Sequence, residues 1–395
     1  MARMKASKLY LRTVCARRSK ETRQNVLSTK VMKEEKTPFG EQIFGTKDWD
    51  SQLLYSTILP IETSKTFPSV ETPDEAYQKT FKNCDELLPT LPQTKGWWFG
   101  QRFQYHGFWI SGFCIRGSML IHDHFKPRST DIVVATSPKC GTTWLRALVF
   151  FIINRASFDF SDHPLRKANP QDLVPCFESI IHKDGSTSFV DGIPSPRLLS
   201  THLPYSLFPT RMTDDTSACR FVYICRDPKD VFVSKWHFAN KLRPKELPPL
   251  SLEETFDLFC KGVSHYGPFW DHVLGYWKAS VESPKKVLFL KYEDVKKEPL
   301  GCVRKVAEFL GVPFTPEEEN KEIVEQIVKL CSFESMSNQD VNKLDKRYQQ
   351  RPVSNSDFFR KGEVGDWVNH LSPQMAEKLD QITEEKLQDT GFNFH

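Results

Sequence analysis

The segment formed by residues 130–153 constrains the fold of this chain more than any other. It begins with the β-branched run Ile132-Val133-Val134, which predicts a buried strand. A short loop with one lysine, one glycine and two threonines follows, and the apolar residues 144–153 then predict a buried helix. A strand, a loop and a helix in this order point backbone N–H groups and the positive end of the helix at an anion. This segment therefore predicts a phosphate-binding loop.

Three further apolar runs predict buried strands, and segments with helical periodicity separate them. The strands are expected at residues 197–202, 221–225 and 286–291, the helices at residues 227–240, 252–265 and 301–310, and a last helix at residues 372–387. Strands that alternate with helices form a parallel sheet covered on both faces. The predicted fold class is α/β, a single domain with a central parallel sheet flanked by helices, over residues 76–395. Functional side chains are then expected at the carboxyl ends of the strands.

Residues 1–75 are expected to form a disordered N-terminal extension. They mix Thr, Ser, Pro and charged residues without a steady periodicity. The first twenty residues are rich in Arg and Lys and contain no acid, as organellar transit peptides do, but they are poor in serine. A disordered basic tail, a start codon placed too early and a transit peptide all fit this composition.

Charge and cysteine content narrow the class of protein. The net charge is +4, and because the first twenty residues hold seven Lys or Arg and no acid, the rest of the chain carries −3. A slightly acidic body argues against nucleic acid as the main partner. The ten cysteines include no C-x-x-C pair, which favours reduced thiols in the cytoplasm. The longest apolar run, residues 147–153, is too short to span a bilayer, so no membrane association is expected.

Two segments are candidates for contact with an apolar ligand. Residues 96–109 place aromatic side chains between glycines, which predicts an antiparallel strand pair. These rings fit a structural core and the wall of a ligand pocket equally well. The Pro-rich residues 242–249 predict a surface loop that could act as a lid.

The residue order in the predicted phosphate loop argues against the usual ATP or GTP site. Lys139 precedes Gly141, whereas a Walker A loop places its lysine after the last glycine. Nucleoside triphosphatases also use an acid at the end of a neighbouring strand to hold Mg²⁺. The predicted strand at residues 221–225 ends instead in Arg226. A cation at this position suits direct contact with an anion, without a metal between them.

Three further positions are candidates for the same site. Arg226 and Ser234 could hold one phosphate together, although Arg226 could equally pair with a nearby aspartate. The turn Arg360-Lys361-Gly362 offers two cations beside a glycine, but such turns are often solvated surface. His202 ends a predicted strand at the same edge of the sheet as the phosphate loop, where a general base would be placed.

Five motifs, taken in order, resemble those of the soluble (cytosolic) sulfotransferases, and the chain is most similar to the plant members. The motifs are PKCGTTW, STHLP, ICRDPKDVFVSKWHF, LKYED and RKGEVGDW, and the match runs from about Tyr77 to the C-terminus. The resemblance implies transfer of a sulfuryl group from 3′-phosphoadenosine 5′-phosphosulfate (PAPS) to a hydroxyl group of a small molecule. The acceptor stays open among flavonoids, steroids, hydroxyjasmonate-like compounds and desulfoglucosinolates.

The resemblance also implies roles for individual residues. His202 would act as the general base, and Lys139 would stabilise the leaving phosphate. Phe238 would face the acceptor. The PAPS-binding residues would be Lys139, Cys140, Gly141, Thr142, Thr143, Trp144, Arg226, Ser234, Tyr292, Ser332, Phe333, Arg360, Lys361 and Gly362. No metal is expected.

Three positions depart from the family pattern. Cys140 stands where serine is common, and it is either a redox-sensitive thiol or an inert small side chain, of which the inert side chain is favoured. Val368 stands where lysine is usual. Of the animal dimer signature K-x-x-x-T-V-x-x-x-E only Glu377 remains, beside Val368, Ser372 and Pro373. A monomer or a weak homodimer is therefore expected.

Two other function classes share the strand–loop–helix pattern. A nucleotide or nucleoside kinase would need ATP and Mg²⁺, and the position of Lys139 argues against it. A non-catalytic nucleotide-binding module would keep the motifs but transfer no group, and the presence of Lys139, His202 and Arg226 together argues against that class. The predicted function is therefore that of an enzyme, a PAPS-dependent sulfotransferase.

Overall fold

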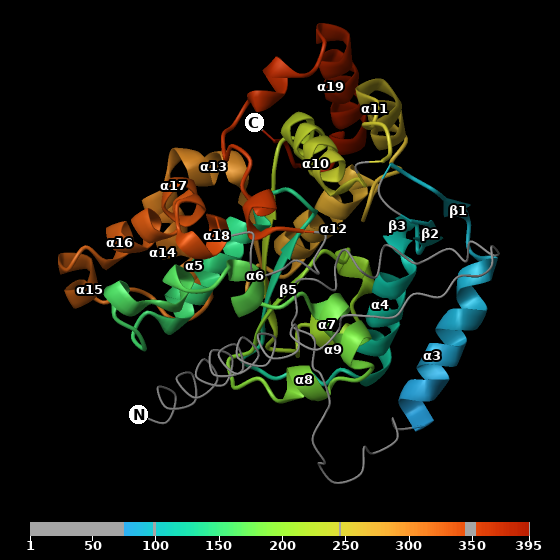
Figure 1. The fold of residues 1–395 in the computed structure, drawn as a ribbon. Coiled ribbons are helices and arrows are strands. Elements are labelled where there is room, and N and C mark those ends of the chain that lie inside the picture. The colour runs from blue at the N-terminus through green and yellow to red at the C-terminus, as the bar shows by residue number, and fades with distance from the viewer. Residues whose placement is uncertain (1–74, 98–99, 245, 344–352, 395) are drawn as a thin grey trace, which may run out of the picture.

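The computed structural model describes residues 75–97, 100–244, 246–343 and 353–394. The predicted N-terminal extension lies outside these residues, apart from Glu75, which begins helix α3 (Glu75–Leu87) (Figure 1). Within the described part of the chain, no helix combines the length and the apolar composition needed to cross a bilayer.

A four-stranded parallel sheet forms the centre of the fold, as the alternation of strands and helices predicted. Its strands are β4 (Ile132–Thr136), β5 (Leu198–Thr201), β6 (Arg220–Cys225) and β7 (Val287–Lys291), in the spatial order β5-β4-β6-β7. Ala135 of β4 pairs with Thr201 of β5 and with Tyr223 of β6. The four predicted strands are therefore confirmed, and the strand that precedes the phosphate loop lies inside the sheet.

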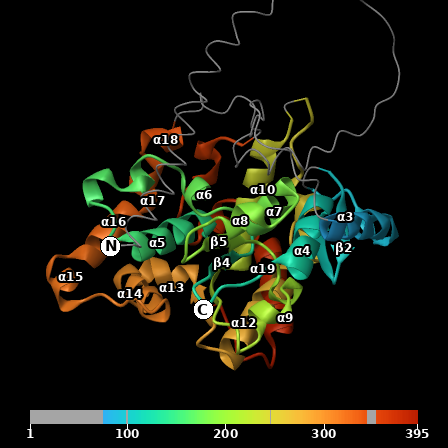
Figure 2. The ribbon, with the colours of Figure 1, turned by 90° about the horizontal axis from the view of Figure 1, so that it is seen from below.

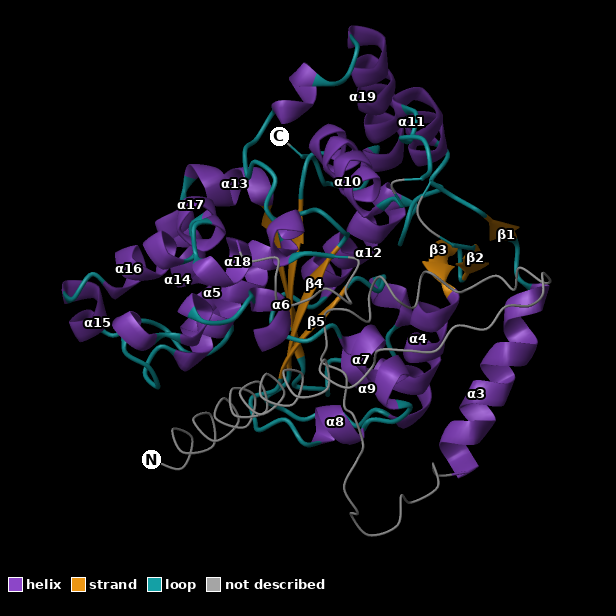
Figure 3. Cartoon of the chain, viewed as in Figure 1, coloured by secondary structure: helices purple, strands orange, loops and turns teal. Residues whose placement is uncertain are grey.

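Alternate residues of each strand pack into two separate cores, one on each face of the sheet, because successive side chains of a strand point to opposite faces. Val133 and Ala135 belong to one core, and Ile132 and Val134 belong to the other. Helices α4 (Gly112–His124), α7 (Phe177–Asp184), α10 (Pro228–Leu242), α12 (Phe269–Glu282) and α19 (Pro373–Leu387) contribute to the first core, and α5 (Thr142–Asn154), α14 (Pro299–Phe309) and α16 (Ile323–Leu330) to the second. Figures 2 and 3 show these two helical layers on either side of the strands.

The aromatic segment forms the predicted strand pair and adds a third, short strand. Strands β1 (Gln93–Thr94), β2 (Arg102–Tyr105) and β3 (Phe108–Ser111) form an antiparallel sheet. Positive φ angles at His106 and Gly107, of 47° and 86°, match the two-residue turn that favours a hairpin. The Phe108 and Ile110 side chains are buried in the first core, so these residues of the hairpin are structural core.

The remaining helices are short, and one differs from its prediction. They are α6 (Pro170–Leu173), α8 (Ser188–Asp191), α9 (Thr210–Thr213), α11 (Leu252–Cys260), α13 (Tyr292–Lys297), α15 (Pro316–Asn320), α17 (Phe333–Ser337) and α18 (Asp340–Lys343). The helix predicted at residues 252–265 ends at Cys260. The cause is Gly262, which has a φ of +78° and lies so close to Pro268 that an added Cβ would be 2.9 Å from its Cγ. The chain therefore leaves the helix early and turns back toward the sheet.

Candidate active site

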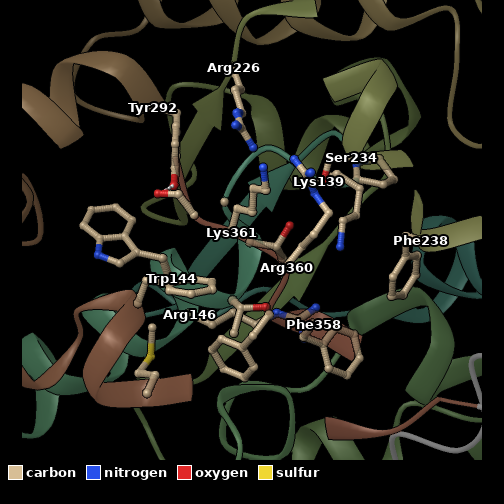
Figure 4. Close-up of a pocket in the computed structure, with 18 of the residues that line it drawn as sticks. Lys139, Trp144, Arg146, Arg226, Ser234, Phe238, Tyr292, Phe358, Arg360 and Lys361 are labelled. Carbon is tan, nitrogen blue, oxygen red and sulfur yellow. Dashed lines mark hydrogen bonds between the residues drawn. The ribbon is translucent and has the colours of Figure 1, made fainter. Parts of the chain in front are cut away.

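A cavity of about 340 Å³ lies beyond the carboxyl ends of the central strands (Figure 4). The loops after β4, β5 and β6 all contribute side chains to it, as expected for a parallel α/β sheet. Fifteen predicted site residues line it: Lys139, Gly141, Thr142, Thr143, Trp144, His202, Arg226, Ser234, Phe238, Tyr292, Ser332, Phe333, Arg360, Lys361 and Gly362. Cys140 is the one predicted site residue that does not. The structure therefore brings five distant motifs to one place.

The phosphate loop joins β4 to the first turn of α5 in a strained backbone conformation. Lys139 and Gly141 have φ angles of 74° and 103°, a region that non-glycine residues rarely occupy. An added Cβ at Gly141 would lie 2.9 Å from Cδ2 of Tyr292, so the loop also leaves no room for a side chain there. Helix α5 begins directly afterwards at Thr142. Its first N–H groups have no partner within the helix and face the position where an anion would bind.

The Lys139 ammonium lies above the ring of Phe238, with Nζ 4.0 Å from the ring centroid. Burial and, to a lesser extent, the positive charges of Arg360, Lys241 and Arg226 together lower the pKa of Lys139 to about 7, while Asp357 opposes them. An anion bound among these cations would raise this pKa again. The loop lysine is therefore tuned to become fully charged when an anion binds.

His202 follows strand β5 and carries its lone pair on Nε2. Its Nδ1 lies 2.8 Å from the main-chain oxygen of Thr136, the last residue of β4. A carbonyl oxygen only accepts hydrogen bonds, so Nδ1 carries the proton of the neutral ring and Nε2 is free to accept one. Burial lowers the pKa of His202 to about 3, and the nearby charge of Arg146 acts in the same direction. The ring is therefore neutral across the physiological pH range.

A buried carboxylate holds the His202 backbone in place. Glu178 is fully buried, and its Oε1 accepts the main-chain N–H of His202 at 3.1 Å and the Tyr266 hydroxyl at 2.8 Å. Its Oε2 accepts the Thr201 hydroxyl at 2.9 Å. His272 Nε2 also lies 2.9 Å from the main-chain oxygen of His202. We did not predict Glu178 as a site residue; a lone acid in the apolar stretch at residues 177–181 was the available signal.

Arg226 lies between the phosphate loop and the cationic turn at residues 360–362. Its guanidinium lies 4.7 Å from the ring centroid of Tyr292 and donates to Asp230 Oδ2 at 3.0 Å. The same carboxylate accepts the main-chain N–H groups of Gly365 at 2.8 Å and Trp367 at 3.1 Å. The predicted pairing of Arg226 with an aspartate is therefore confirmed, and Arg226 also lines the cavity. Its predicted contact with a phosphate stays a prediction.

Asp366 orients the two cations of the turn. It is buried, and it forms salt bridges with Arg360 and Lys361. Burial raises its pKa, but the hydrogen bonds from Lys361 and Arg360 outweigh that effect and hold the pKa well below its usual range. Gly362 has a φ of +68°, and an added Cβ there would lie 2.5 Å from Cδ2 of Phe333. The turn is therefore a built part of the cavity, although the Lys361 side chain is still 44% exposed.

The wall on the side of α17 is aromatic and aliphatic. The Tyr292 hydroxyl donates to the Gly362 carbonyl at 3.0 Å and so links α13 to the cationic turn. Trp144, Ser332 and Phe333 line this part as predicted, and Figure 4 shows the Trp144 ring there. The lining residues that we did not predict on this side are Val295, Lys296, Pro299, Val328, Met336 and Phe359.

The other end of the cavity is the part that sequence reasoning missed most. Phe238 is its one predicted residue besides His202, and Leu242 comes from the beginning of the predicted lid loop. The unpredicted residues are Arg146, Gln171, Cys176, His265, Val353 and Phe358. Arg146 lies in a helix segment that looks simply apolar, and the other five come from loops and helix ends with no motif. Of the hairpin segment, no described residue lines the cavity.

Cys140 is fully buried beneath the loop. Burial raises the pKa of its thiol to about 12. Because the thiolate is the reactive form, this environment supports the inert small side chain rather than the redox-sensitive thiol.

A family model described as Sulfotransferase domain matches residues 129–391, which is more than half of the chain. The chain belongs to the sulfotransferase family. Cytosolic sulfotransferase 16 of Arabidopsis thaliana is 45% identical over 322 residues, which cover 81% of this sulfotransferase and 94% of that protein. The predicted family and the similarity to plant members are confirmed.

Solved structures of the family share the fold. A putative steroid sulphotransferase of Arabidopsis thaliana is 35% identical, with a TM-score of 0.62 and coverage of 84% of this chain and 100% of that one. Retinol dehydratase, solved in complex with androsterone and the inactive cofactor PAP, is 25% identical, with a TM-score of 0.59 and coverage of 79% and 95%. The predicted fold class and enzyme class are therefore confirmed.

Proposed function

We propose that this sulfotransferase transfers the sulfuryl group of PAPS to a hydroxyl group of a small molecule in the cytoplasm. The main support is the position of a neutral histidine beside the phosphate loop, with His202 Nδ1 bonded to Thr136 and Nε2 free to accept a proton. A family structure holds PAP, the nucleotide that PAPS becomes when it loses its sulfuryl group. The curated relatives are named cytosolic, which supports the compartment.

The donor nucleotide is assigned to the cationic part of the cavity. The 5′-phosphosulfate would bind the backbone N–H groups and side chains of residues 139–144, Cys140 contributing its backbone alone. The 3′-phosphate would bind Arg226, Ser234 and the turn at residues 360–362. Trp144, Ser332 and Phe333 would flank the adenine, and Tyr292 would contact the nucleotide. The cations that the aspartates already orient would lose little side-chain freedom on binding.

The chemistry follows from the charges of the site. The acceptor oxygen attacks sulfur while its proton passes to Nε2 of His202, and the bond between sulfur and the phosphate oxygen of PAPS breaks. Negative charge then grows on the leaving phosphate, where Lys139 and the α5 N-terminus stabilise it. The charge of the bound phosphosulfate also raises the pKa of His202 above its value in the free protein, so the histidine is a stronger base when the donor is present.

This proposal places the positive charge on side chains and a helix end, so transfer should not need a metal. Activity that persists in excess EDTA would agree with it, and activity that returns only with added Mg²⁺ would contradict it. Phe238, Leu242 and Phe358 supply an apolar wall for the acceptor. The loss of most of the animal dimer signature supports a monomer or a weak homodimer.

A transfer assay with ³⁵S-labelled PAPS and a panel of phenols, aliphatic alcohols and oximes tests the function. His202→Ala should lower transfer by about 10²–10⁴-fold and leave PAP affinity unchanged. His122→Ala is a matched control, because its side chain is exposed on α4. A normal rate in His202→Ala would disprove the base assignment. Phosphate transfer from ATP with Mg²⁺ in place of sulfuryl transfer would disprove the proposed reaction.

A further inference from the structure

Arg146 is a buried cation without a visible counter-charge. It lies on α5, is 3% exposed and lines the cavity. Its Nε has no hydrogen-bond partner, and no carboxylate of the described residues forms a salt bridge with it. An isolated buried charge is costly, and buried charges are normally paired. A bound anion can supply the partner that the described residues do not.

Two acids, Glu178 and Asp172, act on Arg146 through their charge, but neither forms a salt bridge with it, and Glu178 is already engaged. The two carboxylate oxygens of Glu178 accept hydrogen bonds from the Thr201 hydroxyl, the Tyr266 hydroxyl and the His202 main-chain N–H, as described above. Its charge nevertheless acts on Arg146 and favours the charged guanidinium, while burial lowers the pKa of Arg146. Arginine stays protonated in proteins even when its pKa falls. The cavity therefore contains a permanent positive charge that no acid within residues 75–97, 100–244, 246–343 and 353–394 neutralises by contact.

The charge of the whole lining shows that an anion is expected there. The described residues around the cavity include six Lys or Arg and no Asp or Glu. Four of the six, Lys139, Arg226, Arg360 and Lys361, are assigned to the donor, and Lys296 lies on the same wall as Tyr292. Arg146 is the remaining one, and Figure 4 shows it well separated from Arg226.

The position of Arg146 points to the acceptor rather than to the nucleotide. Arg146 and His202 both line the cavity, and the charge of Arg146 is the largest neighbouring charge acting on His202. Gln171 and Cys176 line the same end. Gln171 Nε2 donates to the Thr143 hydroxyl at 3.1 Å and is therefore already used. His265 also lines this end, but burial lowers its pKa well below the usual range and keeps it neutral. Arg146 is thus the permanently charged group at this end that can recognise an acceptor close to the base.

We propose that Arg146 binds a carboxylate of the acceptor, so the acceptor is a hydroxylated carboxylic acid. The guanidinium offers a planar pair of donors that matches a carboxylate in two parallel hydrogen bonds. The carboxylate would neutralise Arg146 while the hydroxyl of the same molecule lies against His202. This inference rests on the proposed function for the identity of the reaction, but the anion site can be measured without turnover.

The test compares acids with their methyl esters, which differ only in charge at one end. Glycolate, para-hydroxyphenylacetate and ω-hydroxyhexanoate span a range of lengths. Calorimetry measures the affinity of each acid and ester for the PAP-bound protein, and ³⁵S transfer measures kcat and KM. At least one acid should bind with about 10–100-fold higher affinity than its ester, the range expected for charged hydrogen bonds. The same acid should also be sulfated.

Arg146→Met should abolish this preference, because it should lower the affinity for the acid and leave the affinity for the ester unchanged. Arg146→Lys should keep part of the preference. PAP affinity should stay unchanged in both variants. Because Arg146→Met removes an unpaired buried charge, it should also raise the melting temperature of the ligand-free protein. That measurement also checks that the variant folds. Arg304→Met is the matched control, because Arg304 lies on α14 outside the cavity and pairs with Glu319 of α15.

Three results would overturn the inference. One is equal affinity of the wild-type protein for every acid and its ester. Another is an equal loss of affinity for the acid and for the ester in Arg146→Met, which would show that Arg146 supports the structure of the site and does not bind a carboxylate. A third is loss of PAP binding in that variant, which would place it on the donor. If acids bind through Arg146 but no acceptor is sulfated, the proposed function fails while the anion site stands. If alcohols are sulfated without preference for acids, the proposed function stands and the anion site fails.

Discussion

Nδ1 of His202 lies 2.8 Å from the main-chain oxygen of Thr136, and the Thr136 hydroxyl lies 2.7 Å from that of Thr142. One residue at the end of β4 therefore contacts both the histidine after β5 and the first residue of the helix that follows the phosphate loop. Because β4 and β5 are neighbours in a parallel sheet, the base and the loop share one rigid edge. Errors in their relative position would require a distortion of the sheet itself.

Nucleotide affinity should depend on the charge of Lys139. The pKa of this lysine is about 7 in the free protein, lowered by burial and then by Arg360, Lys241 and Arg226. The charged form prefers the anion, so binding of PAP should weaken as the pH rises above about 7, by up to about tenfold per pH unit. Calorimetric titration from pH 6 to pH 9 measures this change. In Lys139→Met the affinity should be lower and the dependence above pH 7 absent; a wild-type affinity that does not vary over this range would contradict the tuned lysine.

Glu178 should act as a positioning residue for His202. Glu178→Ala leaves the His202 N–H and the Tyr266 hydroxyl without their acceptor in a buried place, at a cost of about 1–3 kcal/mol for each group. We expect a lower melting temperature and a kcat reduced at least tenfold, with little change in PAP affinity. Glu178→Gln is the control, because its amide oxygen can accept the same two hydrogen bonds. Equal losses in both variants would indicate that the charge, not the hydrogen bonds, matters.

Gly141 should not tolerate a side chain. Gly141→Ala adds a Cβ at a φ of +103° and 2.9 Å from the Tyr292 ring, so the loop or the ring must move. We expect at least a tenfold loss of PAP affinity, measured by calorimetry. Gly391→Ala is a matched control with a φ of +68° and no atom near the added Cβ; it should lose about 1 kcal/mol of stability and no affinity. Unchanged nucleotide binding in Gly141→Ala would show that the loop does not need this geometry.

Asp230 should couple the cationic turn to α10. Asp230→Asn removes the negative charge that Arg226 faces. It also puts an NH2 group in place of one of the two oxygens that accept hydrogen bonds from the main-chain N–H groups of Gly365 and Trp367. Breaking a buried ion pair costs about 3–5 kcal/mol, so denaturant melts should show a clear loss of stability, and PAP affinity should fall. The control is Asp257→Asn, which breaks the exposed pair with Lys378 and should change stability by no more than about 1 kcal/mol. A similar small effect in both variants would argue against this coupling.

The sheet and the cavity end with the phosphate loop and the cationic turn could be predicted because their signals are local. The β-branched run at Ile132 and the strand end at Arg226 each carry their meaning within a few residues. The end of α11 was wrong by five residues, since Gly262 takes its conformation from contact with Pro268, which local periodicity does not encode. The aromatic hairpin left two interpretations open, and the packing of Phe108 and Ile110 decided for the core.

The cavity end assigned to the acceptor was the least predictable part, because its residues also take their meaning from contacts distant in the sequence. Arg146 lies within an apolar helical segment where a single arginine is unremarkable in sequence. Its role depends on which hydrogen bonds Glu178 and Gln171 already make. Glu178 bonds to Thr201 and Gln171 bonds to Thr143, which lie 23 and 28 residues away in the sequence. Only the assembled packing shows which buried polar groups are satisfied and which are not.

The absence of acids from the described lining of the cavity has a kinetic consequence. The spent nucleotide and the sulfated product are both anions, so each must leave against the same field that drew the donor in. Departure, rather than bond breaking, is then the step most sensitive to ionic strength, because dissolved salt screens that attraction. Moderate salt should therefore raise the KM for the donor and also raise kcat. The first change slows the enzyme at low donor concentration, and the second speeds it at saturating donor.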